Sequence, residues 1–193
     1  MDYQGYLTRP FQDPGWLPKL LIGTLLTIVP IVNLLVLGYC IACIRGGIRG
    51  TAYLPDWRAW QYYLQDGLTA LIITVAYFLV PVLIALFFAL IPVLGMIVSA
   101  ILGLLAGLLV PMALAAYTAT GQISSAWRID EIVLRLERSL DIYAPAYLFL
   151  VLGLTLASVV ITLIPHLALL GFFIIFYLLV VFSFMLGDLY ASR

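Results

Sequence analysis

Two closely spaced cysteines are the first residues in this sequence with possible chemistry. Cys40 and Cys43 form a C-x-x-C pair, a spacing found in redox-active sites and in zinc and iron–sulfur sites. No second cysteine pair exists to complete a four-ligand metal site, and the pair lies within an apolar run. We therefore expect both thiols to serve as packing residues inside a membrane helix.

The single histidine, His166, offers little more chemistry. One histidine excludes a bis-histidine haem and any multi-histidine metal site within one chain. In the topology derived below, His166 lies on the side of the membrane opposite the Asp and Glu residues, so a Ser-His-Asp triad would have to bridge the bilayer. We predict no catalytic residue, no metal ligand and no cofactor-binding residue, and thus a protein that is not an enzyme.

The apolar runs carry no charged residue. Proton relays and ion-coupled carriers usually need an ionisable group within the membrane, so an ion-coupled pump is disfavoured. A channel or carrier would have to use the few polar side chains of these runs, such as Thr27, Asn33, Thr74 and Thr155.

The composition explains why the chemistry is so sparse. Of 193 residues, 65% are apolar and 9% are charged, whereas soluble domains have about 45–50% and about 25%. Nine basic residues balance nine acidic ones, so no net field attracts nucleic acid. The sequence predicts an integral membrane protein, with residues 1–193 forming a single membrane domain.

Uncharged stretches define the expected helices. They cover residues 20–44, 67–127 and 142–187, and one helical crossing needs about 20 residues. The runs lack the alternation of a β-barrel strand, so we predict an all-α fold. Similar proline elements at Pro30, Pro92 and Pro165 suit helix breaks. They predict about six transmembrane helices in three hairpins, at about 16–50, 67–120 and 142–189. The alternative is five, with residues 20–44 forming one kinked span.

The basic residues predict the orientation. With six helices every Lys and Arg lies on one side, whereas with five Arg9 and Lys19 lie on the other. Both arrangements place the arginine-bearing loops, 45–58 and 128–138, in the cytoplasm. The N-terminus lacks the basic region of a signal peptide, so none is expected. We predict a multi-pass protein of the cell membrane.

Two segments between the hairpins are amphipathic. In residues 56–66, tryptophans recur at helical spacing, and residues 127–141 combine an apolar stripe with a charged face. We predict two cytoplasmic helices in the headgroup plane. They connect and cap the hairpins, or alternatively form a docking surface for a cytoplasmic partner or anionic lipid. The surface residues of this prediction are Trp57, Trp60, Arg128, Arg135 and Arg138.

Small residues recur every fourth position in the fourth predicted helix: Gly95, Ser99, Gly103 and Gly107. Such a row, a glycine zipper, allows helix backbones to approach closely. The row packs against a neighbouring helix of the same chain or forms the seam of an oligomer.

These features predict a non-enzymatic accessory, scaffold or assembly subunit that acts through helix association in the bilayer. The alternative is a homo-oligomeric channel or carrier for lipid or a small apolar solute. The expected partners are the lipid bilayer and either further copies of the chain or a larger membrane complex.

The first third of the chain resembles a prokaryotic membrane family defined only as domain of unknown function 4013. That resemblance implies a location in a prokaryotic cytoplasmic membrane and implies no activity and no functional residues. The residues that carry it are Pro14-Gly15-Trp16-Leu17, Leu20-Leu21-Ile22-Gly23, Leu37-Gly38-Tyr39, Arg45, Arg49-Gly50, Leu54-Pro55-Asp56-Trp57 and Asp66-Gly67.

Overall fold

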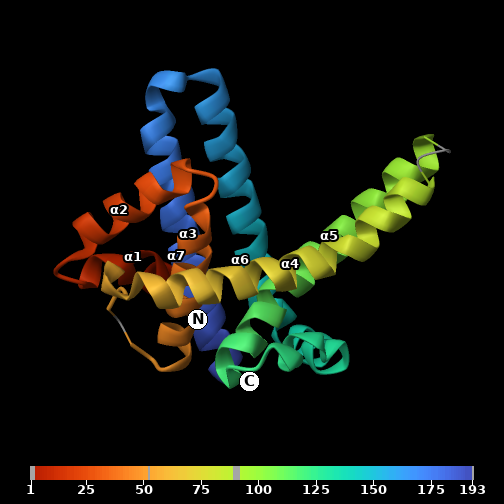
Figure 1. The fold of residues 1–193 in the computed structure, drawn as a ribbon, viewed down its shortest axis with the longest axis horizontal. Helices are drawn as coiled ribbons and strands as arrows, with labels where there is room; N and C mark the ends of the chain where they lie inside the picture. Colours follow the sequence, from red (N-terminus) through yellow and green to blue (C-terminus); the bar gives the residue numbers. More distant parts are fainter. Residues whose placement is uncertain (1–2, 52, 89–91, 193) are drawn as a thin grey trace.

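The computed structural model describes residues 3–51, 53–88 and 92–192, and in these ranges the chain is helical without any strand (Figure 1). The all-α prediction is therefore confirmed. The helices are α1 (Tyr3–Thr8), α2 (Trp16–Ile28), α3 (Asn33–Ile48), α4 (Trp60–Phe88), α5 (Pro92–Thr120), α6 (Ile129–Leu163) and α7 (Ala168–Ser192). Short 3-10 turns η1–η4 cover Arg9–Gln12, Trp57–Ala59, Ile123–Trp127 and Pro165–Leu167.

Four helices are long and apolar enough to cross a membrane, namely α4, α5, α6 and α7. They indicate a membrane protein. Residues 20–44 are divided between two shorter helices, α2 and α3, with the break at residues 29–32. The break surrounds Pro30, as expected for a residue that cannot donate a backbone hydrogen bond.

The other two proline elements also adjoin helix ends. Pro165 begins the turn η4 between α6 and α7, and Pro92 is the first residue of α5. Proline is tolerated at a first helical position because the N–H that it lacks has no partner there anyway. Pro81, Pro111 and Pro145 instead lie inside helices.

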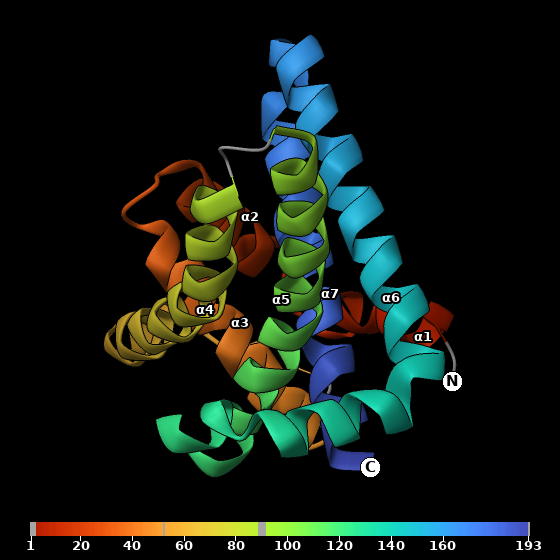
Figure 2. The same ribbon diagram turned by 90° about the vertical axis from the view of Figure 1, so that its right-hand side faces the viewer.

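The two amphipathic segments are not separate helices. Residues 60–66 form the first turns of α4, and residues 129–141 form the first part of α6. Their helical periodicity continues into the apolar runs, and the helix is unbroken at Gly67 in α4 and at Pro145 in α6. Figure 2 shows α6 turning from a transverse to an upright course; Pro145 inside the helix accounts for the bend.

Helix α7 forms the centre of the molecule. In the most apolar stretch of α7, 56% of the residues are buried, whereas the corresponding share is 6% in α4 and 17% in each of α5 and α6. Its buried side chains include Phe176, Val180 and Phe184, which contact the side chains of α2 and α3. Leu178, Phe182 and Met185 contribute to the second cluster, with α5 and α6.

Glycines allow α3 to approach two neighbours closely. A Cβ on Gly38 would lie 1.8 Å from the carbonyl oxygen of Tyr63, and one on Gly67 would lie 1.9 Å from that of Leu34. Gly47 and Gly187 make the same kind of contact between α3 and α7. The backbone of α3 therefore contacts the backbones of both α4 and α7, and these contacts fix α3 between the two helices.

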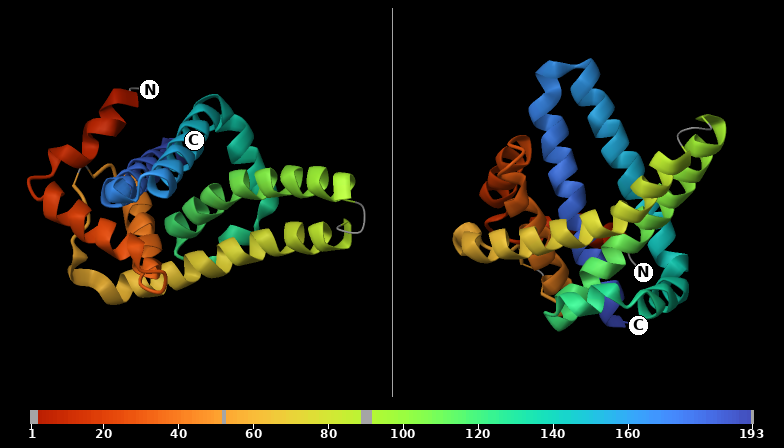
Figure 3. Two further views of the ribbon diagram at one scale, coloured as in Figure 1. Left: turned by 90° about the horizontal axis from the view of Figure 1, so that it is seen from above. Right: turned by 45° about the vertical axis from the view of Figure 1, so that its right-hand side comes forward.

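Helices α4 and α5 run side by side and diverge from the rest of the molecule. Figures 1 and 3 show this pair extending away from the upright pair formed by α6 and α7. The two pairs meet at one end and separate toward their tips. Much of the α4–α5 surface is consequently without an intramolecular neighbour.

Candidate functional site

The glycine row on α5 is packed at one end and open further along. A Cβ on Gly107 would lie 2.6 Å from the hydroxyl oxygen of Tyr147 on α6, whereas one on Gly103 would meet no atom within 4 Å. Ser99 donates its hydroxyl hydrogen to the carbonyl of Gly95 within the helix. The row therefore adjoins α6 near Gly107 and leaves Gly103 uncovered.

The surroundings of Gly103 are apolar and exposed. Met96 is 71% exposed and Leu104 62%, and the facing helix α4 exposes Leu83 and Leu86 to a similar extent. These side chains suit contact with lipid or with another transmembrane helix. We define the exposed α5 face as Met96, Gly103 and Leu104 together with the small residues of the row. This face is the first candidate site.

A tyrosine of α6 connects α6 to α5 by a hydrogen bond. The Tyr143 hydroxyl of α6 donates to the carbonyl of Leu108 at 2.8 Å, one turn before Pro111 in α5. A neighbouring helix commonly supplies such a bond where proline weakens the backbone ladder of a membrane helix. The sequence analysis did not identify Tyr143.

Ion pairs gather at the arginine-bearing end of the molecule. Arg9 pairs with Asp188, and Arg45 pairs with Asp66 at 3.0 Å. Lys19 contacts both Asp13 at 2.8 Å and Asp56 at 2.9 Å. All but the local Lys19–Asp13 pair connect segments far apart in the sequence, so they fix the loops against the helix ends.

Asp13 is the most buried acid of these ion pairs. Its carboxylate accepts hydrogen bonds from the backbone N–H groups of Gly15 and Leu54 and from the Lys19 ammonium. Burial raises the pKa of the Asp13 carboxyl, but the bonds from Lys19 and the two N–H groups outweigh burial, so the pKa lies below its ordinary value. Asp13 therefore acts as a structural anion between η1 and the start of η2.

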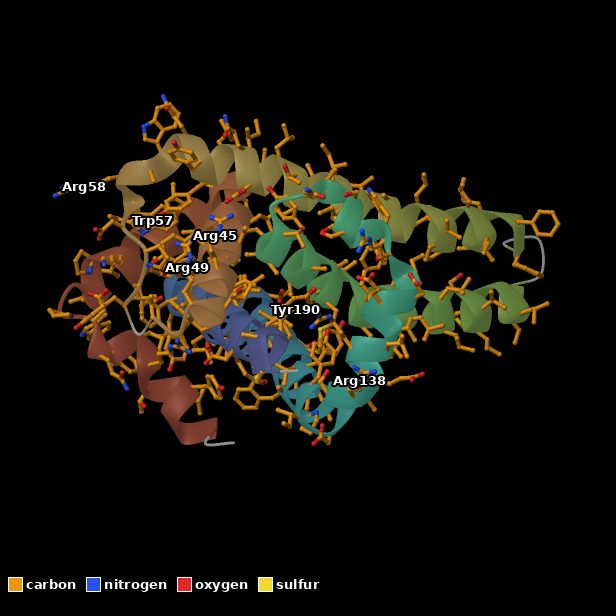
Figure 4. All side chains as sticks on the ribbon, turned by 90° about the horizontal axis from the view of Figure 1, so that it is seen from below. Arg45, Arg49, Trp57, Arg58, Arg138 and Tyr190 are labelled. Carbon is orange, nitrogen blue, oxygen red and sulfur yellow. The ribbon has the colours of Figure 1, made fainter. Side chains whose placement is uncertain are left out.

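The five residues predicted to form a cytoplasmic surface do not form one patch. Trp57 is half-buried, stacked on Tyr39 at 4.3 Å, and its Nε1 donates to the Lys19 carbonyl. Trp60 is 54% exposed. Figure 4 views this end of the molecule and shows Trp57 and Arg138 well apart, on either side of Tyr190.

The three arginines of that prediction differ in their contacts. Arg128 pairs with Glu131, and Arg135 stacks on the Tyr190 ring at 4.3 Å and donates to its carbonyl. Arg138 is exposed. Arg135 thus joins α6 to the end of α7, a structural contact.

Two cavities lie in different parts of the molecule. One, of about 280 Å³, lies between α1, α6 and α7 beside Pro145 and is lined almost entirely by apolar side chains. The other, of about 340 Å³, lies at the arginine-bearing end and includes Arg45 and Arg49. Neither is lined by Thr27, Asn33, Thr74 or Thr155.

The two cysteines and the histidine form no common site. Cys43 is buried and Cys40 half-buried within α3, both as free thiols. His166 is exposed in η4, at the tip between α6 and α7. Within the described ranges, no three His, Cys, Asp or Glu residues lie close enough to hold a metal ion.

The comparison with protein families gives one match, to DUF4013, a protein family of unknown function, over residues 21–166. The chain belongs to the DUF4013 family. The comparison with curated proteins gave no match, and neither did the comparison with solved structures. The resemblance expected from the sequence is thus confirmed, and the function of this DUF4013 chain has to be inferred from its own geometry.

The residues that the sequence analysis missed are those that hold the helices together. Among the described glycines, Gly38, Gly67 and Gly187 make the closest contacts with backbone atoms. Gly38 and Gly187 stand in short small-residue rows, Gly38-Ala42-Gly46 and Ser183-Gly187-Ala191, which were the sequence signal for them, whereas Gly67 has no such neighbours. A Pro-Gly turn directly follows Asp13, and this turn was the one feature of the sequence that indicated a structural role for the carboxylate. A single glycine gives no indication of which helix will lie against it.

Proposed function

We propose that this protein is a non-enzymatic membrane subunit that acts by associating with other helices in the bilayer. One observation carries the proposal: the uncovered Gly103 in the exposed α5 face, on a helix pair that diverges from the rest of the chain. Membrane helices associate through close packing of such small residues. A second copy of the chain or another membrane protein would fill the space beside α5.

The proposal includes a position in the membrane. We place the protein in the cytoplasmic membrane of a prokaryote, with the arginine-bearing loops in the cytoplasm as the positive-inside rule requires. Helices α4–α7 cross the bilayer, while α2 and α3 form a third, shorter hairpin. The ion pairs at the arginine-bearing end support placing that end outside the hydrocarbon, because charged clusters belong in water or headgroups and not among the lipid tails.

The test is assembly of a Gly103→Leu variant, measured by native mass spectrometry after mild extraction from its own membrane. Since the Gly103 site is open within the chain, leucine should leave folding intact and displace only a partner. Ile101→Phe, which adds bulk on the opposite side of α5, is the matched control. Loss of the assembled species in Gly103→Leu alone supports the proposal, and unchanged assembly in both variants refutes it.

The same measurement addresses the alternative, a homo-oligomeric channel or carrier. A mass at a multiple of 21.3 kDa favours self-association, and a mass shared with other polypeptides favours an accessory subunit. Against a polar path, the hydroxyls of Thr27, Thr74 and Thr155 each donate to a carbonyl of their own helix. The accessory function is therefore preferred.

A further inference from the structure

The polar cavity at the arginine-bearing end has the form of a binding site. It lies between the end of α3, residues 53–55 and the first turns of α4, and has a volume of about 340 Å³. That is within the range of about 300–1,000 Å³ for small-molecule sites. Its polar lining comes from Arg45, Arg49, Thr51, Tyr53, Tyr62 and Tyr63.

The described residues do not neutralise all the charge in this cavity. Arg45 pairs with Asp66, whose other carboxylate oxygen accepts from Tyr117. Asp13 and Asp56 are engaged by Lys19, and Asp188, which also lies near the end of α3, is engaged by Arg9. Arg49 is exposed, and its guanidinium has no ion pair or hydrogen bond with any described residue.

The position of Arg49 has one purely structural explanation. It is the C-cap residue of α3, and a cation there offsets the negative end of the helix dipole. That effect explains the residue type, but it does not explain a hollow beside the side chain that also contains a second arginine. Figure 4 shows Arg45 and Arg49 close together at the end of α3, with Arg58 at the outer edge of the molecule.

Two guanidinium groups specify the chemistry of a ligand. Their planar sets of N–H donors match the oxygens of a phosphate, and arginine remains charged at any physiological pH. The exposed side chains of Tyr53 and Tyr62 add a rim of hydroxyl donors. Basic pockets of this kind at helix ends bind the headgroups of anionic lipids, and a soluble phosphate compound offers the same oxygens.

We propose that the Arg45–Arg49 cavity binds a phosphate group. The group belongs either to the headgroup of an anionic lipid or to a soluble phosphate compound. Its oxygens contact the Arg49 guanidinium and the N–H groups that Arg45 does not use for Asp66. This site is independent of the exposed α5 face, so either proposal stands without the other.

Two probes distinguish the sources, each with wild type, Arg49→Gln and the matched control Arg58→Gln. Arg58 is exposed and lies outside the cavity, so its loss removes the same charge. The lipid probe is phosphatidylglycerol, with phosphatidylcholine as reference, titrated into detergent-solubilised protein and followed by native mass spectrometry. The soluble probe is inorganic pyrophosphate, followed by titration calorimetry.

We expect one probe to bind wild type and the Arg58→Gln variant equally and to bind Arg49→Gln about tenfold more weakly, which is the size of one lost charged hydrogen bond. Retention of phosphatidylglycerol identifies a lipid headgroup, and binding of pyrophosphate identifies a soluble ligand. Equal weakening by both substitutions, or no binding of either probe, overturns the proposal. A lower unfolding temperature of Arg49→Gln with unchanged binding would leave only the helix-dipole role and also overturn it.

Discussion

Among single residues, Asp13 is the one whose charge the structure uses most. Its carboxylate joins the turn before α2, the Leu54 backbone and Lys19, and its side chain is 4% exposed. A buried carboxylate with this many donors stabilises the fold only while it is ionised. Protonation would break the pair with Lys19 and weaken two backbone contacts.

The lowered pKa of Asp13 predicts a loss of stability in acid. Because the folded-state pKa is below the ordinary value of about 4, the stabilisation is complete above about pH 4 and is lost as the pH falls through the folded-state pKa. Thermal unfolding in detergent, followed by circular dichroism from about pH 7 to about pH 3, should show this decline. Asp13→Asn should unfold at a lower temperature at neutral pH and lose part of the decline.

Asp130→Asn is the matched control for that measurement, because Asp130 is exposed and its loss should change little. If Asp13→Asn loses as much stability in acid as wild type does, ionisation of the Asp13 carboxylate is not the cause of that loss.

At the scale of elements, the contacts of α3 determine the core. Gly38 and Gly67 place the backbones of α3 and α4 in contact, and the neighbours of each missing Cβ are backbone atoms that cannot rotate away. We expect Gly67→Ala to separate these helices and lower the free energy of unfolding by about 1–3 kcal/mol. Gly103→Ala, at an open position, should be neutral or slightly stabilising, because alanine is the better helix former.

Chemical or thermal unfolding in detergent compares the two glycine variants directly. Equal effects of Gly67→Ala and Gly103→Ala would mean that the α3–α4 contact is not the close one described here.

The elements were also the level at which the sequence was most informative. Pro30 and Pro165 lie at helix breaks because proline acts on its own backbone, a local effect that spacing reveals. The ends of the amphipathic segments were not predictable, since α4 and α6 continue past residues 66 and 141 even though Gly67 and Pro145 follow. The row on α5 was identified, but Gly107 and Gly103 differ only in what lies opposite, which is a property of the fold.

For the whole molecule, one sequence could not reveal which helix is central. Helices α4, α5 and α7 are almost equally apolar, because lipid and protein interior favour the same side chains. Burial of α7 between α3 and α6 depends on pairings such as Gly47 with Gly187 that connect distant parts of the chain. The divergence of the α4–α5 pair from the rest of the molecule likewise depends on contacts between distant parts of the chain, which one sequence does not reveal.

The structure also predicts how deeply the α2–α3 hairpin enters the membrane. Helix α2 has 13 residues and is therefore about 20 Å long, short of the about 30 Å of hydrocarbon. In Figure 1 its tip ends well below the tip between α6 and α7. Ile31 at the α2–α3 tip is 84% exposed and should face lipid, whereas His166 should reach the aqueous side.

Cysteine accessibility tests this depth in membranes, with Cys40 and Cys43 replaced by alanine. A membrane-impermeant maleimide should label His166→Cys from one side and Arg58→Cys from the other. It should label Ile31→Cys from neither side until detergent is added, because a turn inside the bilayer keeps the thiol from water. Labelling of Ile31→Cys as fast as His166→Cys would instead mean that α2 and α3 both cross completely, by thinning the bilayer around them.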